Sequence, residues 1–138
     1  MATTVSDVLA PDIISISATK SVRDAAELMR AADIGALVVT QGGGLVGLVT
    51  DRDLVVRVLA DGKGPQTDVR EACSANLVTV APGDDVRDAA RVMAENGVRR
   101  LPVVSGDKVV GIVSLGDLAI ERDPDSVLGQ VSSAPPNA

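Results

Sequence analysis

The sequence predicts an α/β (α+β) fold made of two tandem copies of one strand–helix–strand–strand–helix unit. Three observations support this fold class. The 138-residue chain repeats itself without a gap at an offset of 64 positions. Within each copy, short apolar runs typical of strands alternate with segments whose apolar residues recur at helical spacing. A unit of roughly 60 residues buries too little surface to be stable alone, so we expect the two copies to form one module.

The repeat is most visible in two lines of sequence. GLVTDRDL, from Gly47, and GIVSLGDL, from Gly111, keep a hydroxyl and a carboxylate in register. The same offset aligns the VRDAA that starts at Val22 with the VRDAA that starts at Val86. The single module 1–138 therefore divides into units 4–62 and 68–122, a linker 63–67 and a flexible C-terminal tail 123–138.

The first strand and the first helix of each unit follow from local patterns. IISIS, from Ile13, and LVTVA, from Leu77, are short apolar runs rich in strand-forming residues. After each run, Val, Ala and Met fall on one face of a predicted helix. Ser21 is the predicted N-cap of the first helix, and Asp84 or Asp85 is that of the second.

Two strands around a glycine turn and a last helix complete each unit. The segments ALVVT-GGG-LVGLVT and LPVVS-GDK-VVGIVS predict hairpins. The last helix is predicted to begin after Thr50 in the first copy and after Ser114 in the second, where Pro124 ends it. GGGLVG in the first hairpin fits the pattern G-x-G-x-x-G, but a strand follows it where a dinucleotide site needs a helix, so we predict a turn.

Composition argues against several classes of function. Thirteen Lys and Arg against 19 Asp and Glu give a net charge of −6, which opposes binding to nucleic acid. No apolar run has the length of a membrane span and the N-terminus lacks a signal-peptide pattern, so we expect no membrane contact and a cytoplasmic protein. With no His and one cysteine, Cys73, the chain offers no metal cluster, internal disulfide or activated nucleophile. We expect no catalytic residue and no metal ligand, and Cys73 is predicted to be a buried packing residue.

The repeated hydroxyl and carboxylate have two interpretations. Thr50 with Asp53, and Ser114 with Asp117, have the spacing of a capping box at a helix N-terminus. The same geometry places a carboxylate on the first helical turn, where it can accept both hydroxyls of a ribose while the helix N-terminus favours phosphate. The two roles are compatible for the hydroxyl residue.

Arg99 and Arg100, before the LPVV strand, form a second candidate site. One interpretation is a solvated pair at the start of a strand. The other is a charge-assisted contact to a phosphate group. The aligned residues of the first copy are Gly35 and Ala36, which cannot bind phosphate through a side chain. The two copies are therefore expected to differ.

These features resemble a pair of cystathionine-beta-synthase (CBS) domains, the arrangement called a Bateman module, over about residues 4–122. The segment VRRLPVVSGDKVVGIVSLGDL, from Val98, is an especially close match. The resemblance implies two units packed sheet to sheet around a pseudo-twofold axis, with two clefts that bind adenosine-containing ligands. Carried over by position, it implies a cleft for a phosphorylated nucleoside at Arg99, Arg100, Ser114 and Asp117, and a ribose cleft with less phosphate affinity at Thr50 and Asp53.

The functional hypothesis is a regulatory module that senses an adenine nucleotide such as AMP, ADP, ATP, S-adenosylmethionine or a dinucleotide. Since the chain has no Phe, Tyr or Trp, the adenine must be held by aliphatic side chains and backbone. We expect a homodimer through the Ala-rich helices that follow Val22 and Val86, and an effector protein that reads the bound state. The alternative is a scaffold that dimerises without binding a ligand. An enzyme is the weakest hypothesis, because the sequence has no pair of nucleophile and base and no cofactor fingerprint.

Overall fold

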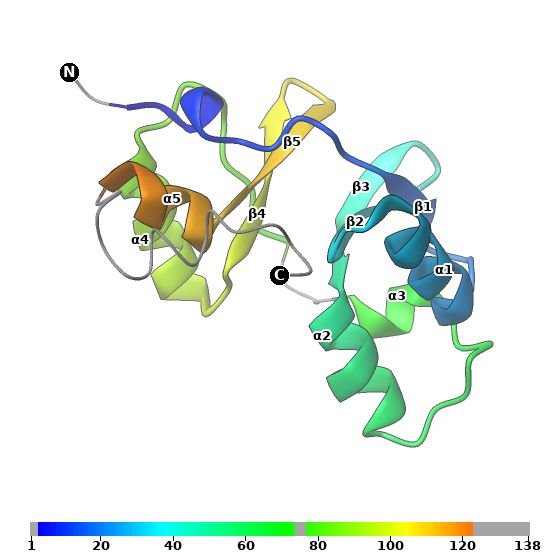
Figure 1. Cartoon of the computed structure of the whole chain (residues 1–138). Coiled ribbons are helices and arrows are strands. Elements are labelled where there is room, and N and C mark those ends of the chain that lie inside the picture. Colours follow the sequence, from blue (N-terminus) through cyan, green and yellow to red (C-terminus); the bar gives the residue numbers. More distant parts are fainter. Residues whose placement is uncertain (1–2, 74–76, 123–138) are drawn as a thin grey trace. The chain divides into compact units, whose positions relative to one another are not determined.

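The computed structural model describes residues 3–73 and 77–122 of the chain. These residues form two compact units of mixed helix and strand, which confirms the predicted fold class (Figure 1). One unit contains residues 14–73 with 77, and the other contains residues 3–13 and 78–122. The predicted tail and Pro124 lie outside the described residues.

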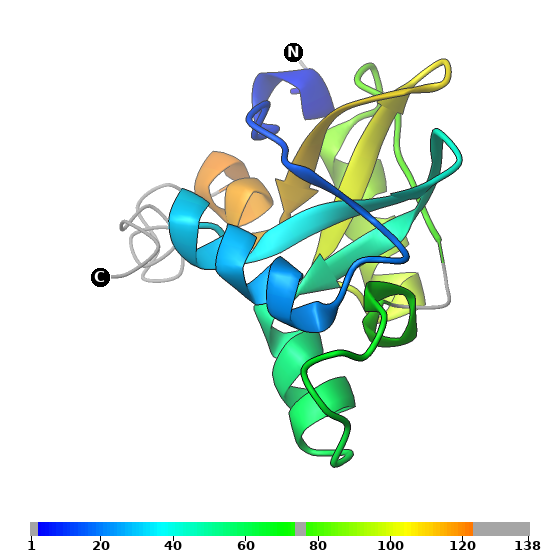
Figure 2. The ribbon, with the colours of Figure 1, turned by 90° about the vertical axis from the view of Figure 1, so that its right-hand side faces the viewer.

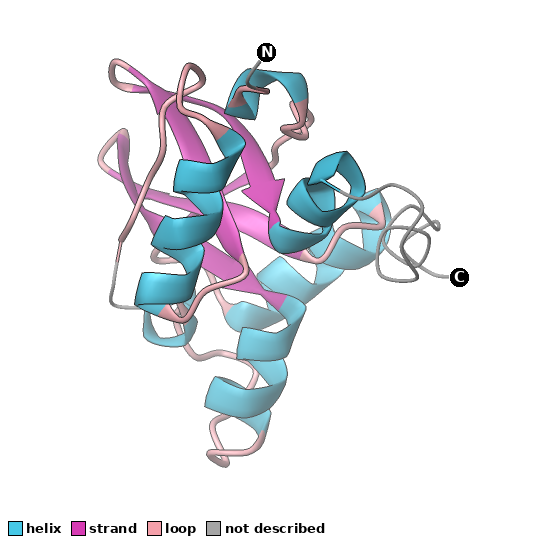
Figure 3. Ribbon diagram, turned by 90° about the vertical axis from the view of Figure 1, so that its left-hand side faces the viewer, coloured by secondary structure: helices cyan, strands magenta, loops and turns pink. Residues whose placement is uncertain are grey.

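The unit of residues 14–77 is built on a three-stranded sheet. Strand β2 (Ala36–Gln41) lies between β1 (Ser15–Ser17), which is parallel to it, and β3 (Gly44–Thr50), which is antiparallel. The predicted glycine turn joins β2 to β3 through Gly42 and Gly43, both with positive φ. The helices of this unit are α1 (Val22–Ala32), α2 (Asp51–Asp53), its π-helical continuation η2 (Leu54–Leu59) and α3 (Val69–Ala72) (Figure 3).

The second unit has a two-stranded sheet among its described residues. Strands β4 (Arg100–Ser105) and β5 (Lys108–Ser114) form the predicted hairpin. The helices are the 3-10 turn η1 (Val5–Asp7), α4 (Val86–Asn96) and α5 (Leu115–Arg122).

The predicted strand LVTVA at Leu77 is shorter than expected. Within the described residues, it is reduced to one parallel bridge between Val80 and Val103. In the other unit Val38 donates its N–H to the carbonyl of Ile14, at 2.9 Å. The repeat offset places Pro102 at the position of Val38, and proline has no N–H to donate. The prediction of a full strand was therefore wrong.

The first helix of each unit is capped by a side chain. Ser21 is the N-cap of α1, as predicted: its Oγ accepts the N–H of Asp24 at 3.1 Å. Of the two candidates for α4, Asp85 is the N-cap, and its Oδ1 accepts the N–H of Arg87 at 2.7 Å. The helix ends at Gly97, which has a left-handed backbone conformation.

Each unit has its own aliphatic core, built from the apolar face of its first helix and from the strands. The core of residues 14–77 includes Val22, Ala25 and Met29, and the other includes their repeat counterparts Val86, Ala89 and Met93. Cys73 is buried in the first of these cores, as predicted. Because Ala25 and Ala89 are fully buried inside their own units, they are not available to the helix-to-helix dimer contact expected from sequence.

The first residues of each repeat pack beside the start of the first helix of the other repeat. The N–H of Val69 donates to the carbonyl of Lys20, and the N–H of Val5 donates to that of Asp84, both at 2.8 Å. The residues that donate these N–H groups, Val5 and Val69, are fully buried. The two bonds are related by the repeat offset, so each repeat contributes its first residues to the unit of the other repeat. The compact units therefore divide the chain differently from the repeat ranges 4–62 and 68–122.

The N-terminal segment also closes the open edge of β5. Ala10 and Ile112 exchange backbone hydrogen bonds of 2.8 and 3.0 Å. Figures 1 and 2 show this segment, in blue, beside the yellow-to-orange hairpin of β4 and β5. A Cβ atom at Gly111 would lie 2.7 Å from the carbonyl oxygen of Ala10, so the close approach requires glycine.

Candidate functional site

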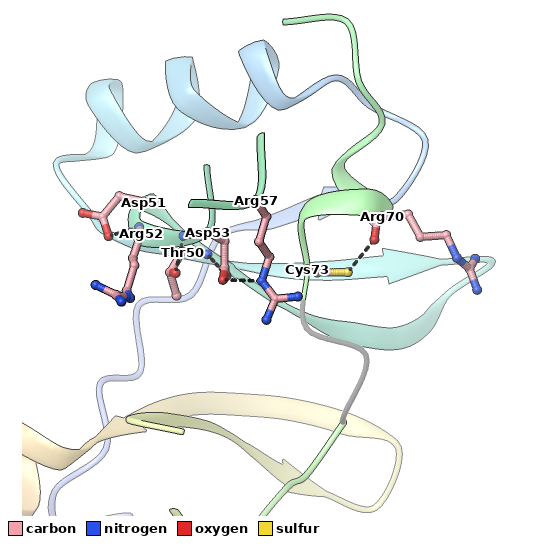
Figure 4. Close-up of polar contacts among 7 residues, drawn as sticks. All are labelled: Thr50, Asp51, Arg52, Asp53, Arg57, Arg70 and Cys73. Carbon is pink, nitrogen blue, oxygen red and sulfur yellow. Dashed lines mark hydrogen bonds and ion pairs between the residues drawn. The ribbon is translucent and has the colours of Figure 1, made fainter. Parts of the chain in front are cut away.

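Two strand-to-helix corners carry the hydroxyl and carboxylate residues singled out in the sequence. In the first corner, Thr50 ends β3, and its N–H donates to Asp53 Oδ2 at 2.8 Å, while the N–H of Asp53 donates to Thr50 Oγ1 at 3.1 Å (Figure 4). In the second corner, the N–H of Ser114 donates to Asp117 Oδ2 at 3.0 Å, and the N–H of Asp117 donates to Ser114 Oγ at 3.1 Å. Both corners are capping boxes, as one interpretation predicted.

Capping leaves acceptor capacity on both carboxylates. A carboxylate has about four lone-pair sites, and the capping box uses one of them on Oδ2. Asp53 and Asp117 are both half-buried, which limits competition from water without removing access. Each can therefore accept hydroxyl donors from a ligand while its helix stays capped.

The corners differ in an ion pair that sequence reasoning missed. Arg57 Nε lies 3.4 Å from Asp53 Oδ1, one helical turn further along the chain. Figure 4 shows the Arg57 guanidinium directed at the Asp53 carboxylate. The repeat offset places Glu121 at the position of Arg57, and a second carboxylate cannot form this pair with Asp117. The i, i+4 spacing of opposite charges was visible in the first copy and is a signal for such a pair.

Arg99 and Arg100 lie beside the second corner. The carbonyl of Arg99 accepts the N–H of Leu115 at 2.8 Å, and Arg100 pairs with Ser114 in the β4–β5 register. Both arginine side chains are exposed. The second corner therefore combines two cations with the capping residues Ser114 and Asp117.

The first corner has an acidic residue where the second has an apolar one. Gly35 accepts the N–H of Asp51 at 3.0 Å, in the bond equivalent to that between Arg99 and Leu115. The Asp51 carboxylate lies over Gly35, since a Cβ atom at Gly35 would be 3.2 Å from Asp51 Oδ2. Negative charge at this point opposes a phosphate, whereas the second corner favours one.

Cys73 lies near the first corner, at the end of α3. Its Sγ donates to the carbonyl of Arg70 at 3.3 Å (Figure 4). Burial raises the pKa of the Cys73 thiol above its ordinary value, against smaller opposing effects of its backbone hydrogen bond and of Arg70. A protonated, buried thiol is a poor nucleophile, so packing is the role that the geometry supports.

Within residues 3–73 and 77–122, no group of three or more His, Cys, Asp or Glu side chains is arranged to hold a metal ion. None of the helices in this part of the chain is long and apolar enough to cross a membrane.

Known proteins are similar to this chain in sequence and fold. The family model described as CBS domain matches residues 5–60 and 69–122. The CBS domain-containing protein YhcV of Bacillus subtilis (strain 168) is 39% identical over 118 residues, which cover 86% of this chain and 84% of YhcV.

Solved structures agree with the family match. A protein with CBS domains from Burkholderia ambifaria MC40-6 superposes with a TM-score of 0.81 at 32% identity, and the match covers 90% of this chain and 96% of that one. The CBS domain pair of protein MJ0100, solved with 5′-methylthioadenosine and S-adenosyl-L-methionine, gives a TM-score of 0.80 at 26% identity, covering 91% of this chain and all of the other. With a matched domain in each repeat, the chain belongs to the CBS domain family, as a tandem pair of CBS domains.

Proposed function

We propose that this CBS pair is a regulatory module that senses an adenosine-containing ligand, with Asp53 and Asp117 as acceptors of ribose hydroxyls. The observation that carries the proposal is the duplicated corner, in which a half-buried carboxylate keeps free acceptor sites after capping its helix. The crystal structure of the MJ0100 pair with two adenosine-containing ligands supports the same ligand class. In this proposal the protein is not an enzyme.

The second corner is the proposed site for a phosphorylated ligand. Asp117 accepts the ribose diol, and Arg99 and Arg100 supply the positive charge for phosphate groups. Leu115, an exposed aliphatic side chain at the start of α5, offers apolar surface to a base. AMP, ADP and ATP fit this description, and S-adenosylmethionine carries the same nucleoside with a different charge.

Assembly and localisation are further parts of the proposal. We propose a homodimer whose ligand-bound state is read by an effector protein, and a cytoplasmic location. Three large aliphatic side chains of η2, Val55, Val56 and Leu59, are exposed to solvent. Because Ala25 and Ala89 of the two Ala-rich helices are buried in their own units, we propose the η2 side chains as the dimer contact.

The deciding experiment separates ligand binding from helix capping at Asp117. Asp117→Asn keeps an oxygen that can accept the N–H of Ser114 but turns one diol acceptor into an amide donor. We expect adenosine and AMP to bind about 10- to 150-fold more weakly, the equivalent of 1.5 to 3 kcal/mol, with little change in thermal stability. Titration calorimetry and thermal unfolding measure the two effects.

Asp24→Asn is the matched control for this experiment. Asp24 Oδ2 accepts the N–H of Ser21 in a capping box of the same kind at the start of α1, and neither residue belongs to the two corners. This variant should change stability as little as Asp117→Asn and leave ligand affinity unchanged. If Asp117→Asn also leaves affinity unchanged, Asp117 is a cap and not a ligand-binding residue.

Absorbance gives an independent test of the ligand class. Because the chain has no Trp, Tyr or Phe, the protein is nearly transparent near 260 and 280 nm. An adenine ligand retained through purification would dominate the spectrum near 260 nm. Neither such absorbance nor a thermal shift with adenine nucleotides is expected of a scaffold that dimerises without a ligand.

A further inference from the structure

The two corners share their capping geometry but not the surroundings of the second carboxylate oxygen. Asp53 Oδ1 is paired with Arg57 Nε at 3.4 Å, and the Asp53 side chain is only 18% exposed. In the described part of the chain, the polar contacts of Asp117 are the two hydrogen bonds of its capping box. The residue aligned with Arg57 is Glu121, whose charge has the opposite sign.

This difference affects how well each carboxylate can accept hydrogen bonds from the two neighbouring hydroxyls of a ribose. Two neighbouring hydroxyls donate to the two oxygens of one carboxylate, so both oxygens need a free lone pair in the right direction. In the first corner Arg57 already occupies one site on Oδ1 and draws negative charge toward itself. A nucleoside must displace or share this contact to bind there.

We propose that Arg57 is a specificity-determining residue that makes the first corner the weaker diol acceptor and leaves Asp117 as the stronger one. The inference rests on the proposed function, because it concerns the ligand preference of the same corners. Arg57 is 48% exposed, so the pair is partly screened by solvent. Partly exposed ion pairs of this kind change an equilibrium by roughly two- to fivefold, which sets the size of the effect on nucleoside affinity.

The test isolates the first corner in an Asp117→Asn background and uses adenosine, which carries no phosphate. Adding Arg57→Met removes the guanidinium while keeping a long apolar side chain. We expect adenosine to bind about two- to fivefold more tightly in titration calorimetry, because Asp53 Oδ1 is released. Thermal unfolding of both proteins establishes that the comparison is made on folded protein.

Arg52→Met in the same background is the matched control. Arg52 is an exposed cation five residues before Arg57, and no contact with Asp53 is present among its described interactions, so its removal tests the general effect of charge. It should leave adenosine affinity unchanged. An equal gain in both variants would overturn the inference, since the effect would then not depend on the ion pair.

A second ligand distinguishes the diol from the rest of the nucleoside. 2′,3′-Dideoxyadenosine has no diol, so Arg57→Met should not strengthen its binding. A gain for this ligand, or unchanged adenosine affinity in Arg57→Met, would overturn the role of Arg57 and leave the proposed function standing. If the wild-type protein binds no adenosine at all, the proposed function fails and the inference fails with it.

The reciprocal substitution tests the second corner. Glu121→Arg, in an Asp53→Asn background, places a cation at the position equivalent to Arg57. It should weaken adenosine binding by a similar two- to fivefold factor. Unchanged or tighter binding would contradict the proposal that a cation at this position decides between the corners.

Discussion

The backbone N–H of Val86, the first residue of α4, donates to the carbonyl oxygen of Thr3 at 3.1 Å. The equivalent bond joins Val22, the first residue of α1, to Thr67 at 2.8 Å. Residues close to the N-terminus thus complete the unit formed by the second repeat, and residues between the repeats complete the first. Neither repeat is a structural unit by its own sequence alone.

Truncating the buried side chains of the exchanged segments should destabilise the unit that each segment completes. Val5 and Val69 are both 0% exposed and are related by the repeat offset. We expect Val5→Ala to cost about 1.5 to 3 kcal/mol of unfolding free energy, as apolar contacts are lost and a cavity forms. Hydrogen exchange should show faster exchange in α4 for Val5→Ala and in α1 for Val69→Ala.

Ser6→Ala provides the control, because Ser6 is exposed on the same turn as Val5. It should leave exchange in α4 close to that of the wild-type protein. If Val5→Ala accelerated hydrogen exchange in α1 and not in α4, the N-terminal segment would stabilise the other unit. The reciprocal packing of the two segments would then be wrong.

Arg99 and Arg100 should act on phosphate and not on the nucleoside. The double variant Arg99→Ala, Arg100→Ala should weaken AMP binding and flatten its dependence on salt, because the phosphate loses its counter-charge. Adenosine affinity should stay nearly constant. Titration calorimetry at low and high salt measures both ligands, and Arg91→Ala on the outer face of α4 serves as an exposed-arginine control. Equal losses for AMP and adenosine would contradict a phosphate role.

The order of strands and helices was predictable because the local signals agree with the final packing. The apolar spacing of Val22 and Met29 predicted the buried face of α1, and glycines marked the hairpin turn. The prediction of a full strand at Leu77 was wrong because it considered only the composition of that run. Strand formation also depends on the neighbouring strand, where Pro102 lacks the N–H that Val38 donates in the other unit.

The exchange of segments could not be predicted, because the docking surfaces are copies of one another. Val5 and Val69 meet equivalent helix starts at Asp84 and Lys20, so local sequence does not select the unit that each joins. The capping boxes were predictable from the Thr/Ser-x-x-Asp spacing. The repeat alignment predicts only features that both copies have, and the Arg57–Asp53 ion pair depends on a residue that the copies do not share.

The proposed dimer should depend on η2 more than on α1. Leu59 is 73% exposed, and a carboxylate there would be buried without a partner in an apolar contact. We expect light scattering to give about twice the 14.0 kDa mass of one chain for the wild-type protein, and a lower mass for Leu59→Glu. Ala26→Glu, at an exposed position of α1, should keep the dimer. A wild-type monomer that persists at high concentration would rule out the homodimer.

Cys73 should make stability depend on pH above neutrality. Burial raises the pKa of its thiol, so the folded protein holds the proton at pH values where the unfolded chain, with a thiol pKa of about 8.5, releases it. The unfolded state then binds fewer protons, and the free energy of unfolding falls as pH rises. The contribution is complete below the unfolded pKa and is lost as pH rises through the folded one. Denaturant unfolding between pH 7 and 10 should show this fall in the wild-type protein.

Cys73→Ala removes the titrating thiol and isolates its effect. The difference in unfolding free energy between wild type and this variant should be constant near neutral pH and shrink at higher pH, because every other titratable group is common to both proteins. The folded wild-type thiol should also react slowly with a disulfide reagent at neutral pH and faster once denaturant unfolds the chain, since both burial and protonation protect it. A constant difference up to pH 10, or equal reaction rates for folded and unfolded protein, would show that Cys73 is not held protonated by burial.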